Sequence, residues 1–203
     1  NEIHYDIEHH DQNLYREPRQ LRVHPWLGPS LHDALILSDS RHFLDFIQAG
    51  VRGQFNEPEH VYQRSHTLLK SARGYWLEHH LNPPDVSPPE IEEYLKTLEN
   101  VVNSLALLES PPFTIRRLGA EFAERAQALE QPQLYGQFLS LLGGERVNLE
   151  TLNSWLPLWA DSITSLPDER CPVELHPFRK NYYLKGMQSV LAGEHPKGAL
   201  WPL

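Results

Sequence analysis

The chain has 203 residues, of which 40% are hydrophobic, and a formal net charge of −9. This length fits one domain, or the end of one domain followed by a second. The negative charge argues against a broad surface for nucleic acid or anionic membranes. The single cysteine, Cys171, excludes an internal disulfide and a cysteine-rich zinc site. No apolar run approaches the roughly 20 residues that span a bilayer, so we expect a cytoplasmic protein without a membrane partner.

Residues 1–12 predict a half-buried β-strand, because charged and apolar side chains alternate there. One face carries Glu2, His4, Asp6 and Glu8. Three carboxylates this close repel one another, so a bound metal ion would stabilise them. An edge strand with a solvated acidic face is the alternative. The chain begins inside this strand with no partner strand before it, and no Met begins the chain, so we expect it to be the later part of a longer polypeptide.

Residues 13–55 predict short elements joined by turns. Pro18 interrupts the polar segment 13–23, which predicts a loop or a frayed helix. Ser30 is expected to cap a short helix through Ala34, with Asp33 in the capping-box position. The apolar run 35–37 predicts a second strand that ends in an Asp-containing turn. An amphipathic helix is expected over residues 41–55, and its apolar stripe comprises Phe43, Phe46, Ile47, Val51 and Phe55.

From Pro58 onward the pattern is helical, and proline-containing links separate the helices. We expect helices over residues 58–80, 87–109, 114–129, 131–142, 149–163 and 173–191. Five or six helices with short links predict an antiparallel bundle. The expected fold is therefore mainly α, with a short α/β remnant in residues 1–40 and a helical domain in residues 41–203.

Histidine is abundant, with twelve residues, and two adjacent pairs are possible metal ligands: His9 with His10, and His79 with His80. Neighbouring residues on a strand or helix point in different directions, so neither pair is a ready chelate. The sequence contains no HExxH, no Gly-rich phosphate loop with Lys and no GxSxG. Without these motifs, the sequence does not indicate a common hydrolase or a protein with a phosphate-binding loop.

Arg73 and His80 lie seven residues apart in the helix expected over residues 58–80, so they share almost the same face. A cation and an imidazole placed over a phosphodiester could support RNA cleavage. This spacing is similar to the Arg-to-His motif of HEPN-domain ribonucleases, which implies that activity as one alternative. The alternative is purely structural: Arg73 faces solvent, and His80 lies near the negative end of the helix dipole.

The order of features over residues 2–55 resembles the polymerase-β type of nucleotidyltransferase, in the bacterial subgroup that includes aminoglycoside nucleotidyltransferases. That family has a strand with an acid between apolar residues, like 1–5, and a Trp-Leu turn, like 25–29. An apolar strand ending in Asp comes next, like 35–40, and then a helical domain, as 41–191 would be here. The family's Gly-Ser turn with two acids one residue apart is absent, so either it lies before Asn1 or this chain has no catalytic centre.

The resemblance implies that a nucleoside monophosphate is transferred from an NTP to a hydroxyl of a small-molecule acceptor such as an aminoglycoside. Glu2 matches the family's third carboxylate, which completes a Mg²⁺ site or serves as a base. Asp6, on the same strand face, is the second catalytic candidate. The helical domain would bind the acceptor and determine which acceptor is used. A negatively charged surface would favour a cationic acceptor. A non-enzymatic helical interaction module is the remaining alternative.

Overall fold

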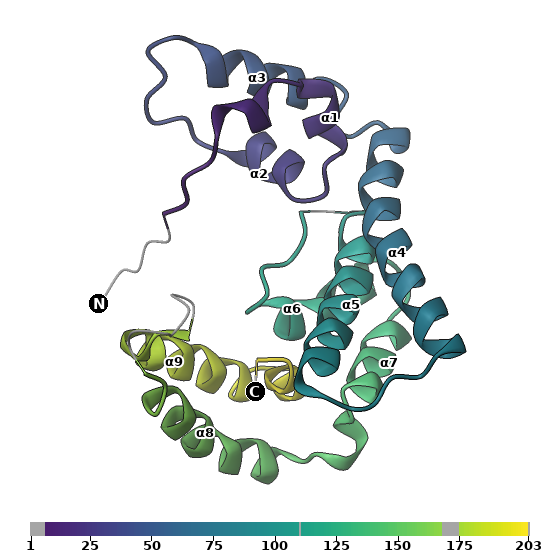
Figure 1. Ribbon diagram of the computed structural model, residues 1–203, viewed down its shortest axis with the longest axis vertical. Coiled ribbons are helices and arrows are strands. Elements are labelled where there is room, and N and C mark those ends of the chain that lie inside the picture. Colours follow the sequence, from purple (N-terminus) through teal and green to yellow (C-terminus); the bar gives the residue numbers. More distant parts are fainter. Residues whose placement is uncertain (1–6, 110, 168–174, 203) are drawn as a thin grey trace. The chain divides into compact units, whose positions relative to one another are not determined.

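The computed structural model describes residues 7–109, 111–167 and 175–202. Its described part is mainly α-helical, as the sequence predicts, and the helices are joined by turns and short 3₁₀ segments (Figure 1). The α-helices are α1 Pro18–Val23, α2 Leu27–Asp33, α3 Phe43–Arg52, α4 Pro58–Leu81, α5 Pro88–Ala106, α6 Leu118–Ala128, α7 Gln133–Leu141, α8 Leu149–Thr164 and α9 Lys180–Leu191. The 3₁₀ segments include η1 Gln12–Tyr15, η2 Gly144–Arg146, η5 Pro177–Arg179 and η6 Pro196–Leu200.

The expected α/β remnant is wrong for the part of residues 1–40 that the structure describes, since residues 7–40 contain η1, α1 and α2 and no strand. Pro18 does not break a helix but begins α1, at a position where its missing N–H costs nothing. The apolar run 35–37 is not hydrogen-bonded as a strand, and Leu35 and Leu37 are 83% and 89% exposed. A strand needs a neighbour for its backbone groups, and the described chain offers none there.

The chain divides into two compact units. Unit 1 comprises Asn1–Pro84 with Asn103–Pro112, and unit 2 comprises Asp85–Val102 with Phe113–Leu203. The last turn of α5 therefore belongs to unit 1 and the rest of that helix to unit 2. The predicted domain boundary at residue 40 separates two expected functions and not two packed units. It stays a prediction.

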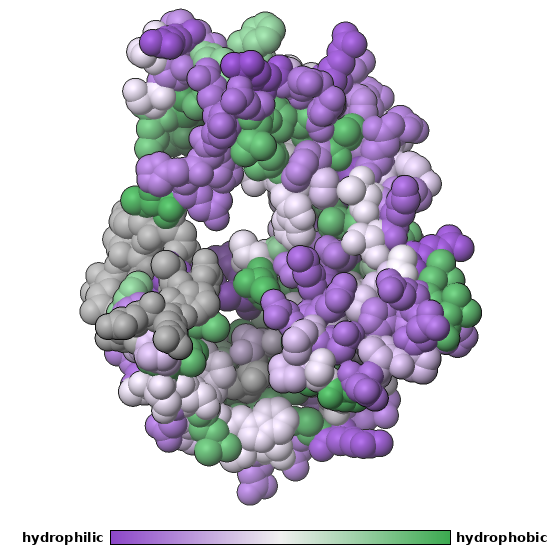
Figure 2. Space-filling model, in the orientation of Figure 1, coloured by the Kyte–Doolittle hydropathy of each residue, from purple (hydrophilic) through white to green (hydrophobic). Residues whose placement is uncertain are grey.

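One hydrophobic cluster of unit 1 is formed by α1, α3 and the turn after α3. Its buried side chains are Leu21, Ile47, Val51 and Phe55. Of the predicted stripe, Ile47, Val51 and Phe55 are buried in this cluster, and Phe43 packs against it. Phe46 is 73% exposed, so its expected place in the stripe is wrong. Residues 47 and 51 are one turn apart, whereas residue 46 is rotated by about 100° from residue 47. Figure 2 shows mainly hydrophilic side chains on the visible face of α1 and α3, with apolar ones between them.

Helix α2 begins earlier than the sequence predicts. Its first backbone N–H groups, those of Trp26 and Leu27, donate to Nδ1 of His24 at 3.2 and 3.1 Å. Ser30 is inside the helix, where its hydroxyl donates to the Trp26 carbonyl at 2.9 Å, so the expected Ser30 cap is wrong. Asp33 consequently ends the helix instead of occupying a capping box. An imidazole thus satisfies N–H groups that Ser, Thr, Asp or Asn usually satisfy.

Lowering the pH from 7 to 5 is expected to destabilise unit 1 through His24. Desolvation lowers the pKa of this imidazole below its usual value, so the unfolded chain takes up the proton more readily than the folded one. The stability that neutral His24 provides near pH 7 is therefore lost as the pH falls. Urea midpoints at both pH values measure the effect. His24→Asn keeps a capping acceptor without a titrating ring and should shrink the difference; an unchanged difference would contradict this role.

In unit 2, α6 packs closely against the C-terminal segment η6. A Cβ atom added at Gly119 would lie 2.3 Å from the Gly198 carbonyl oxygen, so the two backbones meet where neither residue carries a side chain. Trp201 comes directly after η6, and its Nε1–H donates to the Ile115 carbonyl at 2.7 Å. Helices α8 and α9 also contact each other and η6 (Figure 1). Asn148 caps α8, because its side chain accepts from the Thr151 N–H at 2.8 Å.

Candidate functional site

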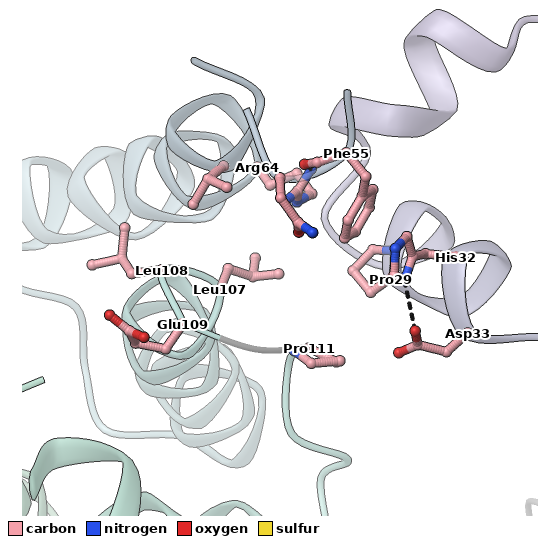
Figure 3. A pocket seen from close by; sticks show the side chains of 11 residues that line it. Pro29, His32, Asp33, Phe55, Arg64, Leu107, Leu108, Glu109 and Pro111 are labelled. Atoms are coloured by element: carbon pink, nitrogen blue, oxygen red, sulfur yellow. Dashed lines mark hydrogen bonds and ion pairs between the residues drawn. The ribbon is translucent and has the colours of Figure 1, made fainter. Parts of the chain in front are cut away.

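A cavity of about 180 Å³ lies within unit 1 and is the strongest candidate site. Its polar wall comprises His32, Asp33, Asn56, Arg64 and Glu109. Its apolar wall comprises Pro29, Phe55, Val61, Leu107, Leu108 and Pro111. The end of α2, the turn after α3, the start of α4 and the segment after α5 therefore each contribute to it. Figure 3 shows Arg64, Phe55 and His32 around one part of the opening and Leu107, Leu108 and Glu109 around another.

Two carboxylates, Asp33 and Glu109, give this cavity acidic character. Asp33 Oδ1 accepts a hydrogen bond from Nδ1 of the adjacent His32 at 2.6 Å (Figure 3). The Glu109 carboxylate forms no hydrogen bond or ion pair with any residue that the structure describes. A carboxylate that no protein cation neutralises favours a ligand with a positively charged group or several hydroxyls.

Arg64 lines the cavity and is only 2% exposed. Its Nη1 donates to the carbonyls of Arg22 and Phe55 at 2.9 and 3.0 Å, and its guanidinium carbon lies 3.8 Å from the centroid of the Phe55 ring. Burial lowers the pKa of Arg64 to about 10, so the side chain is still charged at neutral pH. Its Nε atom is buried and has no hydrogen-bond partner within the described chain. Arg64 thus links the start of α4 to the ends of α1 and α3.

Two side chains of α3 hold the backbone at the cavity's His32–Asp33 corner. Gln48 is buried, and its Nε2 donates to the carbonyls of Leu31 and Ala34, both at 2.8 Å. Arg52 Nε donates to the His32 carbonyl at 2.9 Å. These bonds satisfy carbonyl groups that have no partner at the C-terminus of a helix. The corner is therefore fixed by side chains from a neighbouring helix.

A second hollow, of about 460 Å³, lies between η1 and the start of α3 in unit 1. Asp39 supplies the single carboxylate among its lining residues. That carboxylate accepts from the backbone N–H groups of Leu44 and Asp45 at 2.6 and 3.0 Å and so caps α3. Because this acid already serves the helix, the hollow is the weaker candidate.

The predicted catalytic residues Glu2 and Asp6 lie outside the described residues, so their role stays a prediction. The same holds for the expected Mg²⁺ site at Glu2. Residues 7–109, 111–167 and 175–202 contain no group of three His, Cys, Asp or Glu side chains that could hold a metal ion.

His10, His79 and His80 each contact a neighbouring side chain or carbonyl. His10 contacts Glu8 at 3.0 Å and also bonds to the Tyr15 hydroxyl. His79 Nδ1 lies 2.9 Å from the Tyr75 carbonyl, and His80 stacks on Trp76 with ring centroids 5.1 Å apart. The adjacent residues His79 and His80 thus have different partners, as their positions in the sequence predict.

Arg73 and His80 are both on α4, where Arg73 is exposed and the ring of His80 packs on a neighbour. The ring of His80 lies nearly parallel to that of Trp76, at an angle of 12°. The ribonuclease alternative, which rests on Arg73 and His80, stays a prediction.

The His32–Asp33 pair and Arg64 were not predicted from the sequence. The sequence predicts Asp33 near the start of its helix, whereas Asp33 lies at the helix end, in contact with His32. Arg64 had a readable signal, since it lies three residues after Val61 and four before Leu68, both on the apolar side of α4. This spacing places Arg64 on the buried face of the helix. A charged residue on a buried face is the pattern that could have revealed it.

Comparison of the chain with protein-family models, curated proteins and solved structures gives no match. The resemblance to nucleotidyltransferases therefore rests on the sequence features alone. No helix in the described part of the chain is long and apolar enough to cross a membrane. The cytoplasmic location stays a prediction.

Proposed function

We propose that this chain is the acceptor-binding part of a nucleotidyltransferase, which transfers a nucleoside monophosphate from an NTP to a hydroxyl of a cationic small molecule. The observation that carries the proposal is the cavity with two carboxylates, Asp33 and Glu109, on its wall. An ammonium group of the acceptor would interact with these acids, and its hydroxyls would bond to the polar side chains around them. An aminoglycoside combines both kinds of group.

The size and charge of the site support this class of acceptor. Its volume of about 180 Å³ is below the ~300–1,000 Å³ that is common for drug-sized ligands, so it suits one ring or side group of a larger acceptor. The net charge of −9 would attract a polycation towards the protein at low ionic strength. The two carboxylates outnumber the one arginine of the wall, Arg64, whose guanidinium is directed at the Phe55 ring and two carbonyls.

The exposed apolar run 35–37 also supports the proposal. In the family that the sequence resembles, this position is a strand. Leu35 and Leu37 have more than four fifths of their surface exposed, and a neighbouring strand would cover them and pair with the backbone between α2 and α3. A catalytic domain with a β-sheet would provide such a strand.

Transfer activity tests the proposal. The natural polypeptide that contains this chain is incubated with each α-³²P-labelled NTP, Mg²⁺ and the aminoglycoside kanamycin A. The expected result is labelled kanamycin and an equal amount of pyrophosphate. Glu109→Gln should raise the KM for kanamycin about tenfold, a loss of about 1.4 kcal/mol in binding.

Glu124→Gln is the matched control, because Glu124 is an exposed acid of α6 that does not line the cavity. It should leave the KM unchanged. Absence of transfer with all four nucleotides would contradict the proposed function. An equal KM for the Glu109 and Glu124 variants would contradict the assignment of the cavity to the acceptor.

A further inference from the structure

The His32–Asp33 pair has the arrangement of a general base. The bond between His32 Nδ1 and Asp33 Oδ1 is 2.6 Å long. An ionised carboxylate can only accept, so Nδ1 carries the hydrogen and Nε2 of the neutral ring carries the lone pair. Nε2 makes no hydrogen bond with any residue that the structure describes. The ring therefore has a free proton-accepting atom, and both residues of the pair line the cavity.

The imidazole is held on its face as well as at its edge. The rings of His32 and Phe55 are stacked, with centroids 4.2 Å apart and an angle of 23° between them. The guanidinium of Arg64 in turn lies 3.8 Å from the Phe55 ring centroid. The backbone of the corner is fixed separately by Gln48 and Arg52. Such support from several elements is what keeps a reactive group in one orientation.

A second His–Asp pair in the chain lacks these features. His42 and Asp45, at the start of α3, are joined at 2.9 Å, but the His42 side chain is 83% exposed and neither residue lines the cavity. The short His–Asp contact alone therefore does not mark a site. The combination of that contact, a stacked ring and a cavity is found at His32.

We infer that His32, oriented by Asp33, removes the proton from the acceptor hydroxyl during nucleotidyl transfer. The hydroxyl oxygen forms a bond to the α-phosphorus of the NTP, and its proton passes to Nε2 of His32. The bond between the α-phosphorus and the oxygen that bridges to the β-phosphate breaks, and pyrophosphate leaves with that electron pair. Asp33 stabilises the imidazolium, which then releases the proton to water.

This inference rests on the proposed function and adds the identity of the base. The resemblance implies that Glu2 either binds the metal or serves as the base. With His32 as the base, Glu2 would bind the metal. The inference also explains why a polar pair at the end of a short helix is fixed by two side chains of α3.

His32→Gln tests the inference in the same transfer assay. The variant should lose at least about 100-fold in kcat, since positioned proton transfer contributes about 10²–10⁴-fold. Its KM for kanamycin should stay within about twofold. His42→Gln, the matched control from the exposed pair, should keep the wild-type kcat. In His32→Ala, added imidazole should restore part of the lost kcat, a result that a purely structural role would not give.

The outcomes separate the two proposals. If the wild-type polypeptide transfers no nucleotide, the proposed function fails. If it does and His32→Gln keeps its kcat, or loses only acceptor affinity, the function stands and the base assignment is overturned. Circular dichroism checks that each variant is folded, and Asp33→Asn provides a second folded variant, which should also lower kcat. A folded His32→Ala protein that imidazole does not restore would likewise overturn the assignment.

Discussion

Replacement of Arg64 by methionine is expected to lower the free energy of unfolding by about 3 kcal/mol or more. Methionine fills a similar volume but cannot donate to the carbonyls of Arg22 and Phe55. Hydrogen bonds from a charged group contribute about 1.5–3 kcal/mol each, and the two carbonyls would lose the bonds that Nη1 now makes with them. The variant also loses the contact between the guanidinium and the Phe55 ring. Urea denaturation monitored by circular dichroism measures the loss.

Two further substitutions make the Arg64 result specific. Arg73→Met changes an exposed arginine of the same helix and should alter stability by no more than about 0.5 kcal/mol. Arg64→Lys keeps the charge but loses the planar fork that reaches both carbonyls, so an intermediate loss is expected. Equal stability of the Arg64→Met and Arg73→Met variants would contradict the role of Arg64 as the link between α4 and the ends of α1 and α3.

Gly119→Ala is expected to destabilise unit 2 by about 2 kcal/mol. The new Cβ would lie 2.3 Å from the Gly198 carbonyl oxygen and 2.8 Å from the Trp201 Cβ, both closer than atoms can approach. The clash involves backbone, so α6 and η6 must separate, and the loss exceeds the gain in helix propensity from Gly to Ala. Thermal unfolding measures the effect, and Trp201 fluorescence should change because its ring is docked by the Ile115 carbonyl.

Gly136→Ala is the matched control for Gly119. Gly136 also lies inside a helix, α7, but a Cβ added there meets nothing within 4 Å. This substitution should stabilise the protein by about 0.5–1 kcal/mol, through helix propensity alone. If Gly119→Ala is as stable as Gly136→Ala, the close approach of α6 and η6 does not hold.

Helical periodicity and proline positions were sufficient to predict the mainly helical character of the chain, whereas the antiparallel bundle stays a prediction. Helix α4 was expected over residues 58–80 and extends over Pro58–Leu81. Proline at the first helical position and Glu59 in the first turn are local signals that need no tertiary context. The cap at Asn148 is equally local. Such elements are predictable because the interactions that set their boundaries lie within a few residues.

Some errors occurred where distant residues decide the structure. The run 35–37 has the composition of a strand, but a strand forms only beside a second one, and the described chain provides none. The start of α2 was mispredicted for a local reason, because the imidazole of His24 accepts from the backbone two and three residues later and His is not a usual capping residue. The candidate site was missed because its walls come from α2, α4 and the segment after α5, which are far apart in the sequence.

Hydrogen exchange of the chain with and without kanamycin A shows directly whether the cavity of unit 1 binds a cationic acceptor. We expect slower exchange in peptides that cover residues 27–36, 54–64 and 105–109, and no change in those from α6 to α9. A fully N-acetylated kanamycin, which keeps the rings but loses the positive charges, should give no protection. Protection confined to unit 2, or equal protection by both compounds, would contradict the binding of a cationic acceptor in this cavity.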